Sequence, residues 1–140
     1  MPSSKMIPGT PQEWLARAKG NLTLAKLEKP EGAFWEDLCF NAQQAAEKAV
    51  KAVFQHKGIL FRYIHDLEEL ITDLERHGVE IPDKVKEAAK LTQYALELRY
   101  PGHSEQGTEE EYRQALKIAE RVYAWAEAII AQSHPSPTTP

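Results

Sequence analysis

Apolar residues recur at alternating spacings of three and four along most of this chain, which is the pattern of one face of an α-helix. The pattern is longest over residues 34–54, where no Pro or Gly interrupts it. Its apolar stripe is wider than one partner helix would cover, and the alanines in its middle leave room for close backbone approach. We therefore predict that this stretch is the central helix of a small bundle.

End signals define the first helix and the end of the central one. Residues 10–13, Thr-Pro-Gln-Glu, combine an N-cap, a Pro at the first helical position and an acid at the third, and so form a capping box. Pro30 is expected to stop this first helix before a tight turn at Gly32, which makes the first two helices antiparallel neighbours. Gly58 suits a left-handed cap at the end of the central helix.

Three more helices follow from similar signals. Asp66 caps the third helix. A fourth helix is predicted from residues 82–83, Pro-Asp, to about Arg99, because Pro101 disfavours helical geometry at the residue before it. Thr108 then caps the last helix, after a loop.

These elements predict an all-α fold, an up-and-down bundle of four to five helices over residues 10–131. Residues 1–9 are expected to form a loose N-terminal segment, and residues 132–140 a disordered tail rich in Pro, Ser and Thr. A chain of 140 residues makes one domain the default. Cys39 is the only cysteine and lies on the apolar stripe, so we interpret it as a small buried hydrophobe.

Charge and hydropathy set broad limits on function. The net charge is -4, which argues against broad, charge-driven binding of nucleic acid. A local run of cations is flanked by acids and is predicted to be a solvated helix face. It comprises Lys48, Lys51, Lys57 and Arg62. No segment approaches membrane-spanning length and the N-terminus lacks an apolar signal core, so we expect a cytoplasmic protein with no membrane contact.

The sequence lacks the motifs of the best-defined sites. It has no phosphate-binding Gly loop, no zinc-ligand spacing and no nucleophile elbow. No two histidines lie four residues apart with supporting acids, so neither a metal nor a cofactor is expected. The histidines are His56, His65, His77, His103 and His134.

Two stretches nevertheless suggest a site. His65 comes just before Asp66, the better helix cap, so His65 caps that helix or fills a polar pocket in the bundle. Arg99 and His103 lie on one Pro-Gly loop, where His would move a proton at a 2′-hydroxyl and Arg would steady phosphate charge during RNA cleavage. A cation at the end of a helix also interacts favourably with the helix dipole, so a structural role for Arg99 is the alternative.

Three stretches together resemble the HEPN domain (higher eukaryotes and prokaryotes nucleotide-binding). They are residues 34–49 in the central helix, His65-Asp66-Leu67 at the start of the third helix, and Arg99-Tyr100-Pro101 at the end of the fourth. The resemblance covers about residues 10–131 and implies a helical bundle that forms a homodimer. It also implies a minimal nucleotidyltransferase as partner, in a two-component system that is often a toxin and its antitoxin.

The resemblance leaves three functions open. The first is a module that binds a nucleotide or an RNA phosphate through Arg99, Tyr100 and His65, with the nucleotidyltransferase as partner. The second is a metal-independent endoribonuclease toxin with Arg99 and His103 as catalytic residues. Active members of the family space this Arg and His by four to six residues, whereas three residues separate them here. The third is a purely structural helical dimerisation module.

Overall fold

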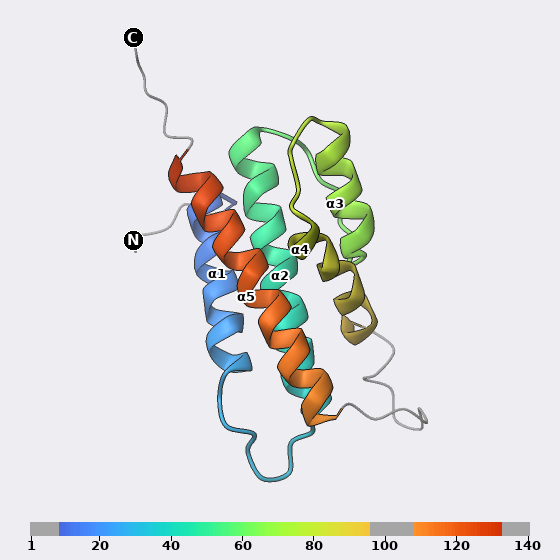
Figure 1. The fold of residues 1–140 in the computed structure, drawn as a ribbon. Helices are drawn as coiled ribbons and strands as arrows, with labels where there is room; N and C mark the ends of the chain where they lie inside the picture. The colour runs from blue at the N-terminus through green and yellow to red at the C-terminus, as the bar shows by residue number, and fades with distance from the viewer. Residues whose placement is uncertain (1–8, 96–107, 133–140) are drawn as a thin grey trace, which may run out of the picture.

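A computed structural model describes residues 9–95 and 108–132 of the chain, and within them it confirms the predicted all-α fold (Figure 1). The predicted loose segment up to residue 8 and the predicted tail from residue 133 lie outside the described residues. The elements in chain order are α1 (Pro11–Ala25), α2 (Trp35–Lys57), α3 (Leu67–Arg76), α4 (Asp83–Lys86), the 3₁₀ helix η1 (Glu87–Ala95) and α5 (Glu109–Gln132).

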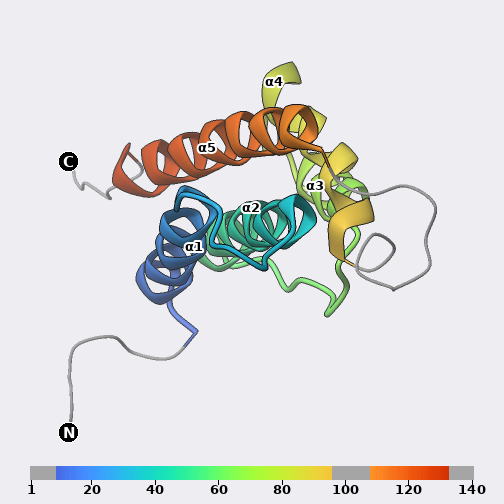
Figure 2. The same ribbon diagram turned by 90° about the horizontal axis from the view of Figure 1, so that it is seen from below.

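The helix α2 is central, as its wide apolar stripe predicts. It contacts α1 and α5 along its length, and η1 and α3 lie on its other side (Figures 1 and 2). Most of its middle and C-terminal half is therefore buried, on more than one face. The buried residues of α2 are Leu38, Cys39, Ala42, Gln43, Ala45, Ala46, Glu47, Ala49, Val50, Lys51, Ala52, Val53 and Phe54.

The N-terminus of α1 follows the prediction, but its C-terminus does not. The Thr10 hydroxyl accepts a hydrogen bond from the Glu13 backbone N–H at 3.2 Å, which caps the helix. The helix ends at Ala25, five residues before Pro30, so the prediction that Pro30 stops it is wrong. The physical reason is a long-range contact: the Tyr112 hydroxyl of α5 donates to the Ala25 carbonyl at 2.8 Å and satisfies one of the carbonyls left over at the helix end.

Three other predicted helix ends are confirmed, at Gly58, Asp66 and Thr108. Gly58 follows α2 with φ 71°, a left-handed conformation that a residue with a side chain adopts only with strain. The Asp66 carboxylate accepts from the Glu68 backbone N–H at 3.0 Å and caps α3. At α5 the capping box is complete, because Thr108 Oγ1 accepts from the Glu111 N–H and the Thr108 N–H donates to the Glu111 carboxylate, both at 3.1 Å.

The fourth helix differs from the single α-helix that its sequence predicts. It is α-helical for one turn, in α4, and continues as the 3₁₀ helix η1, while its predicted end at Arg99 lies outside the described residues. A 3₁₀ helix has three residues per turn, so side chains three apart share one face. The buried apolar residues here recur at that spacing and so favour the tighter helix. They are Val85, Ala88, Leu91 and Tyr94.

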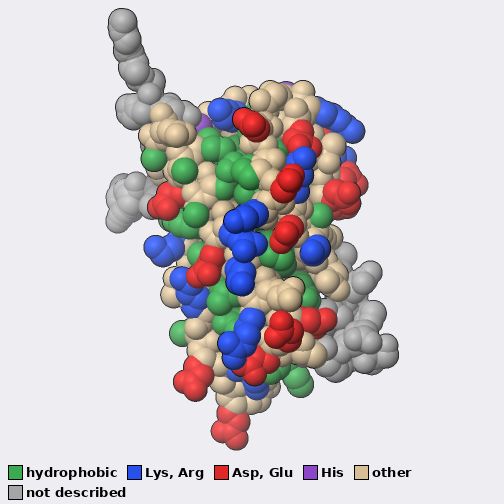
Figure 3. All heavy atoms as spheres, viewed as in Figure 1, with side chains coloured by type: hydrophobic (Ala, Val, Ile, Leu, Met, Phe, Trp, Pro, Cys, Tyr) green, Lys and Arg blue, Asp and Glu red, His purple; other side chains and the backbone are tan. Residues whose placement is uncertain are grey.

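The surface of the bundle is charged. In Figure 3 acidic and basic side chains are spread over one face, and Lys and Arg gather over α5. Within residues 9–95 and 108–132, none of the helices is long and apolar enough to cross a membrane.

Candidate functional site

The residues that the sequence predicts for the site divide between two parts of the chain. Arg99, Tyr100 and His103 lie outside the described residues. His65 is described and lies in the connector between α2 and α3. The described chain stops at the end of η1 and resumes at the cap of α5, so these two ends bracket the Arg99 segment.

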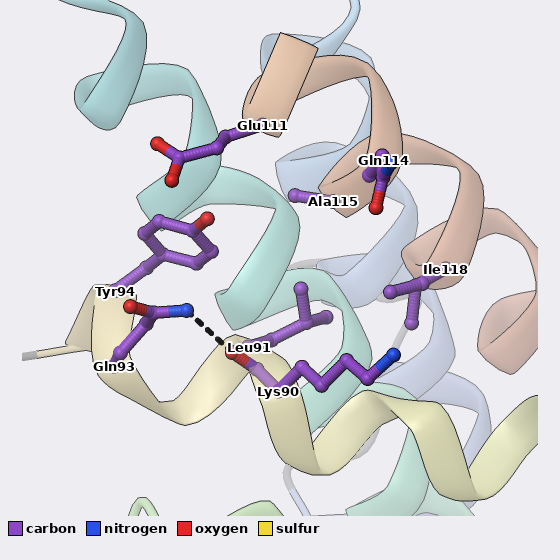
Figure 4. A pocket seen from close by; sticks show the side chains of 8 residues that line it. All are labelled: Lys90, Leu91, Gln93, Tyr94, Glu111, Gln114, Ala115 and Ile118. Carbon is purple, nitrogen blue, oxygen red and sulfur yellow. Dashed lines mark hydrogen bonds between the residues drawn. The ribbon is translucent and has the colours of Figure 1, made fainter. Parts of the chain in front are cut away.

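A cavity of about 190 Å³ lies between the two bracketing ends (Figure 4). Tyr94 from η1 and Glu111 from α5 lie next to each other on one side of it, and Lys90 reaches across the other side toward Ile118. The lining residues are Lys90, Leu91, Gln93, Tyr94, Glu111, Gln114, Ala115 and Ile118. The last described turns before the Arg99 segment and the first turns after it therefore form one polar cavity.

Burial keeps the Tyr94 phenol and the Cys39 thiol protonated. Burial, reinforced by the neighbouring Cys39 and Glu111, raises the pKa of the Tyr94 phenol well above its ordinary value. Tyr94 is therefore a hydrogen-bond donor at neutral pH and not a base. Burial also raises the pKa of the Cys39 thiol to about 12. This agrees with the interpretation of Cys39 as a buried hydrophobe, because the thiolate is the reactive form of cysteine.

A larger groove of about 400 Å³ lies next to this cavity on α5. Lys90, Gln114 and Ile118 line both spaces, so cavity and groove are neighbours. The other five side chains that line the groove are all charged. They are Glu87, Glu110, Arg113, Lys117 and Arg121.

A second polar feature, a buried network, occupies the middle of α2. The Glu47 carboxylate accepts hydrogen bonds from Gln43 Nε2 and Lys51 Nζ, both at 2.8 Å. The Lys51 side chain is only 7% exposed, and its ammonium lies 5.7 Å from the ring centre of Trp14 and 5.3 Å from that of Phe61. The prediction that Lys51 belongs to a solvated helix face is wrong, because a carboxylate and two aromatic rings replace water around its charge.

His65 closes this network on its solvent side. Its Nδ1 lies 3.0 and 3.1 Å from the two carboxylate oxygens of Glu47, while 59% of its side chain is exposed. Asp66 caps α3, so His65 does not cap that helix, and the contact with Glu47 is the polar interaction that its side chain makes. The connector is also tied to η1, because the Leu67 backbone N–H donates to the Thr92 hydroxyl at 3.0 Å. His65 thus lies on a segment held to the helix that leads to Arg99.

The network makes stability depend on pH through Glu47. Burial favours a higher pKa, but hydrogen bonds from Lys51, His65 and Gln43 and the charge of Lys51 outweigh it and hold the Glu47 pKa below its ordinary value of 4.5. A carboxyl whose pKa is lower in the folded state stabilises the fold fully above pH 4.5, and this contribution is lost as the pH falls through the folded-state pKa.

We therefore expect the free energy of unfolding, measured with urea from pH 7 to pH 3, to fall more steeply in the native chain than in a variant without this carboxylate. The variant combines Glu47→Leu with Lys51→Met, so that no unpaired charge remains. Glu68→Gln, which removes an exposed carboxylate outside the network, is the control. Equal pH dependence in the native chain and the double variant would contradict the assignment.

The sequence contains a signal for the network. Gln43, Glu47 and Lys51 recur every four residues, so they share one face of α2 in the part that the apolar stripe surrounds. The cations of the groove show the same spacing on α5. In both cases regular polar spacing marks a face, but only the fold shows whether that face is buried or open.

No metal centre is evident within residues 9–95 and 108–132. The His, Cys, Asp and Glu side chains there form no group of three that could hold an ion. The carboxylate beside His65 is already occupied, because Glu47 also accepts hydrogen bonds from Lys51 and Gln43.

Comparison with known proteins places the chain in a family. The sequence pattern of the HEPN domain matches residues 11–129. The crystal structure of TT1696 from Thermus thermophilus is similar, with a TM-score of 0.73 and 32% identity over 85% of this chain and 97% of that one. The crystal structure of ST0689, an archaeal HEPN homologue, has a TM-score of 0.69 and 28% identity over 86% of this chain and 98% of that one. The comparison with curated proteins finds no match. The chain therefore belongs to the HEPN domain family.

Proposed function

We propose that this HEPN domain is a module that binds a nucleotide or an RNA phosphate in the cytoplasm. Arg99 supplies the charge that holds the phosphate, and Tyr100 and His65 complete the site. The domain acts as a homodimer with a minimal nucleotidyltransferase as its partner, in a two-component system of the toxin–antitoxin type.

The cavity between η1 and α5 is the observation that carries this proposal. Its lining comes from the last turns of η1 and from α5 from Glu111 onward, which are the described elements before and after the Arg99 segment in sequence. Lys90 contributes an ammonium and Tyr94 a phenol that stays protonated, and both are hydrogen-bond donors suited to phosphate oxygens. The hydrogen bond from Leu67 to Thr92 ties the connector that carries His65 to η1, one wall of the cavity. It therefore supports the proposal that His65 belongs to the same site.

The Arg99→Ala variant is expected to bind single-stranded RNA and ATP about ten- to a hundredfold more weakly than the native chain. The reason is the loss of a charge-assisted hydrogen bond to phosphate, which contributes about 1.5–3 kcal/mol. Isothermal titration calorimetry on the purified protein measures the change. Arg76→Ala removes an exposed guanidinium from the C-terminal end of α3 and serves as the matched control. Equal affinity in the native and Arg99→Ala proteins would refute the assignment of Arg99.

The same proteins distinguish binding from catalysis. Incubated with mixed cellular RNA and a metal chelator, a binding module leaves the RNA intact. Cleavage that disappears in both Arg99→Ala and His103→Ala would instead establish the endoribonuclease alternative. A chain that neither binds nor cleaves, and loses only stability on Arg99→Ala, would support the purely structural dimerisation module.

The partnership is tested separately from the ligand. If a minimal nucleotidyltransferase is encoded beside this chain, the two proteins are expected to co-purify when expressed together from one operon. Separate elution of the two from a size-exclusion column would contradict the partnership without affecting the phosphate site.

A further inference from the structure

His65 holds one ring nitrogen against a buried acid and leaves the other free. Its Nδ1 lies 3.0 and 3.1 Å from the two carboxylate oxygens of Glu47, whose side chain is only 4% exposed. The Glu47 carboxyl is ionised at neutral pH, because its pKa lies below the ordinary value of 4.5, and an ionised carboxylate only accepts hydrogen bonds. In the neutral imidazole the proton is therefore on Nδ1, and Nε2 carries the lone pair.

The Nε2 atom is open to a reactant. The His65 side chain is 59% exposed, and Nε2 makes no hydrogen bond to any residue that the structure describes. The backbone on either side is hydrogen-bonded, since the Ile64 N–H donates to the Arg62 carbonyl at 2.9 Å and the Asp66 carboxylate caps α3. The lone pair is therefore presented from a segment that is anchored to the bundle.

The acid behind the ring has its charge compensated. Lys51 Nζ lies 2.8 Å from one Glu47 oxygen, and Gln43 Nε2 donates to the other oxygen, also at 2.8 Å. The ion pair of Glu47 and Lys51 has no net charge, so it does not repel an anionic reactant that approaches Nε2. A positive charge that develops on the imidazole is nevertheless stabilised, because the carboxylate contacts Nδ1 directly.

The chain contains a matched histidine that lacks the carboxylate. His77, at the end of α3, is exposed, and its Nδ1 lies 2.9 Å from the backbone carbonyl oxygen of Asp73. A carbonyl also only accepts hydrogen bonds, so His77 has the same neutral tautomer as His65. The partner of Nδ1 is a neutral carbonyl at His77 and an ionised carboxylate at His65. A difference in reactivity between the two rings therefore reports the effect of Glu47.

We infer that His65 is a phosphoryl-acceptor site, at which Nε2 takes a phosphoryl group from a donor with a phosphorus–nitrogen bond, such as a phosphohistidine of another protein. The Nε2 lone pair attacks phosphorus and forms a new P–N bond, while the P–N bond of the donor breaks. The donor reacts in its protonated form and leaves as a neutral imidazole or amine with the electron pair of the broken bond. The Nδ1 proton stays between His65 and Glu47, and nothing is oxidised or reduced.

The class of donor follows from what the site offers. It supplies a nucleophile and a carboxylate that stabilises positive charge on the ring, and the sequence has no Gly loop to hold the phosphates of a nucleoside triphosphate. Exchange of one P–N bond for another is nearly balanced in free energy, so a free lone pair in the correct tautomer is the main requirement. This reaction goes beyond the proposed function, because it requires neither Arg99 nor a bound nucleotide.

The experiment treats the folded chain with phosphoramidate at about pH 8, where an ordinary imidazole is neutral. NMR of isotope-labelled histidine rings locates the lone pair of each ring and follows phosphorylation at each nitrogen. His65 should be phosphorylated at Nε2 about tenfold faster than His77, because a carboxylate partner of histidine changes activity by about 10–100-fold. The Glu47→Gln/Lys51→Met variant keeps an acceptor for Nδ1 but removes both charges, so its His65 should react at the rate of His77. His77→Gln should leave the rate at His65 unchanged.

Equal rates at His65 and His77 in the native chain would overturn the inference, and so would a proton on Nε2 of His65. This comparison needs no variant, so it holds even where the double variant does not fold. An undiminished rate in a folded double variant, checked by circular dichroism, would reject the role of Glu47. Phosphorylation of His65 by magnesium ATP but not by phosphoramidate would reject the class of donor. Binding of RNA and ATP is measured without phosphoramidate, so none of these results bears on Arg99.

Discussion

Replacing Glu47 with Ala is expected to lower the free energy of unfolding by about 3–5 kcal/mol, because breaking a buried ion pair leaves the other charge without compensation. The remaining charge would be Lys51, whose side chain is 7% exposed. Gln43 and His65 would lose their shared acceptor as well, since both contact the Glu47 carboxylate. An isolated ammonium among aromatic rings cannot recover the interaction with water that it gave up on folding.

Urea unfolding at pH 7, followed by circular dichroism, measures this loss. The variant that combines Glu47→Leu with Lys51→Met separates the cost of an unpaired charge from the value of the pair. Replacing both members of a buried pair with apolar residues is often neutral or stabilising, so this variant should be markedly more stable than Glu47→Ala. A Glu47→Ala protein within about 0.5 kcal/mol of the native chain would show that Lys51 finds water or another partner.

The Phe54→Ala variant is expected to lose a similar amount, about 3–5 kcal/mol, as large-to-small changes of a buried aromatic residue do. Phe54 is fully buried near the end of α2, and its ring centre lies 5.7 Å from that of Phe61 in an edge-to-face contact. Its carbonyl also accepts the Ile59 backbone N–H at 2.9 Å, just beyond the left-handed Gly58. The cavity would therefore open where the core meets the connector that carries His65.

Thermal and urea unfolding of Phe54→Ala should both report the change. Leu60→Ala is a matched control, because Leu60 lies in the same connector and is 96% exposed. Its truncation should alter the unfolding free energy by no more than about 0.5 kcal/mol. Similar losses in the two variants would mean that the connector, and not the core around Phe54, limits stability.

The sequence predicts most of this fold because local signals determine it. The apolar spacing of α2, the Thr10 and Asp66 caps and the glycine after α2 each act within one or two helical turns, and the structure contains all of them. The end of α1 was predicted wrongly because a residue 87 positions away, Tyr112, hydrogen bonds to it. The helical type of η1 was missed because apolar positions three apart fit an α-helical face almost as well as a 3₁₀ one.

The polar features were harder to predict for a different reason. Whether Lys51 is solvated or buried depends on Trp14 and Phe61, which come from other segments, and a single helical pattern does not contain that information. The groove joins Lys90 with Lys117, which lie 27 residues apart in sequence and on different helices. The nearness of Arg99 to His103 and the family resemblance predict Arg99 as a site residue, and it lies outside the described residues.

The three-residue repeat of η1 has a consequence for how this family can vary. One residue inserted between Ala88 and Tyr94 would rotate all later positions of the helix by about 120°, because a 3₁₀ helix completes a turn in three residues. Tyr94 would then leave the buried face. Insertions in this helix are tolerable only in multiples of three, so its length in relatives should vary in whole turns or not at all.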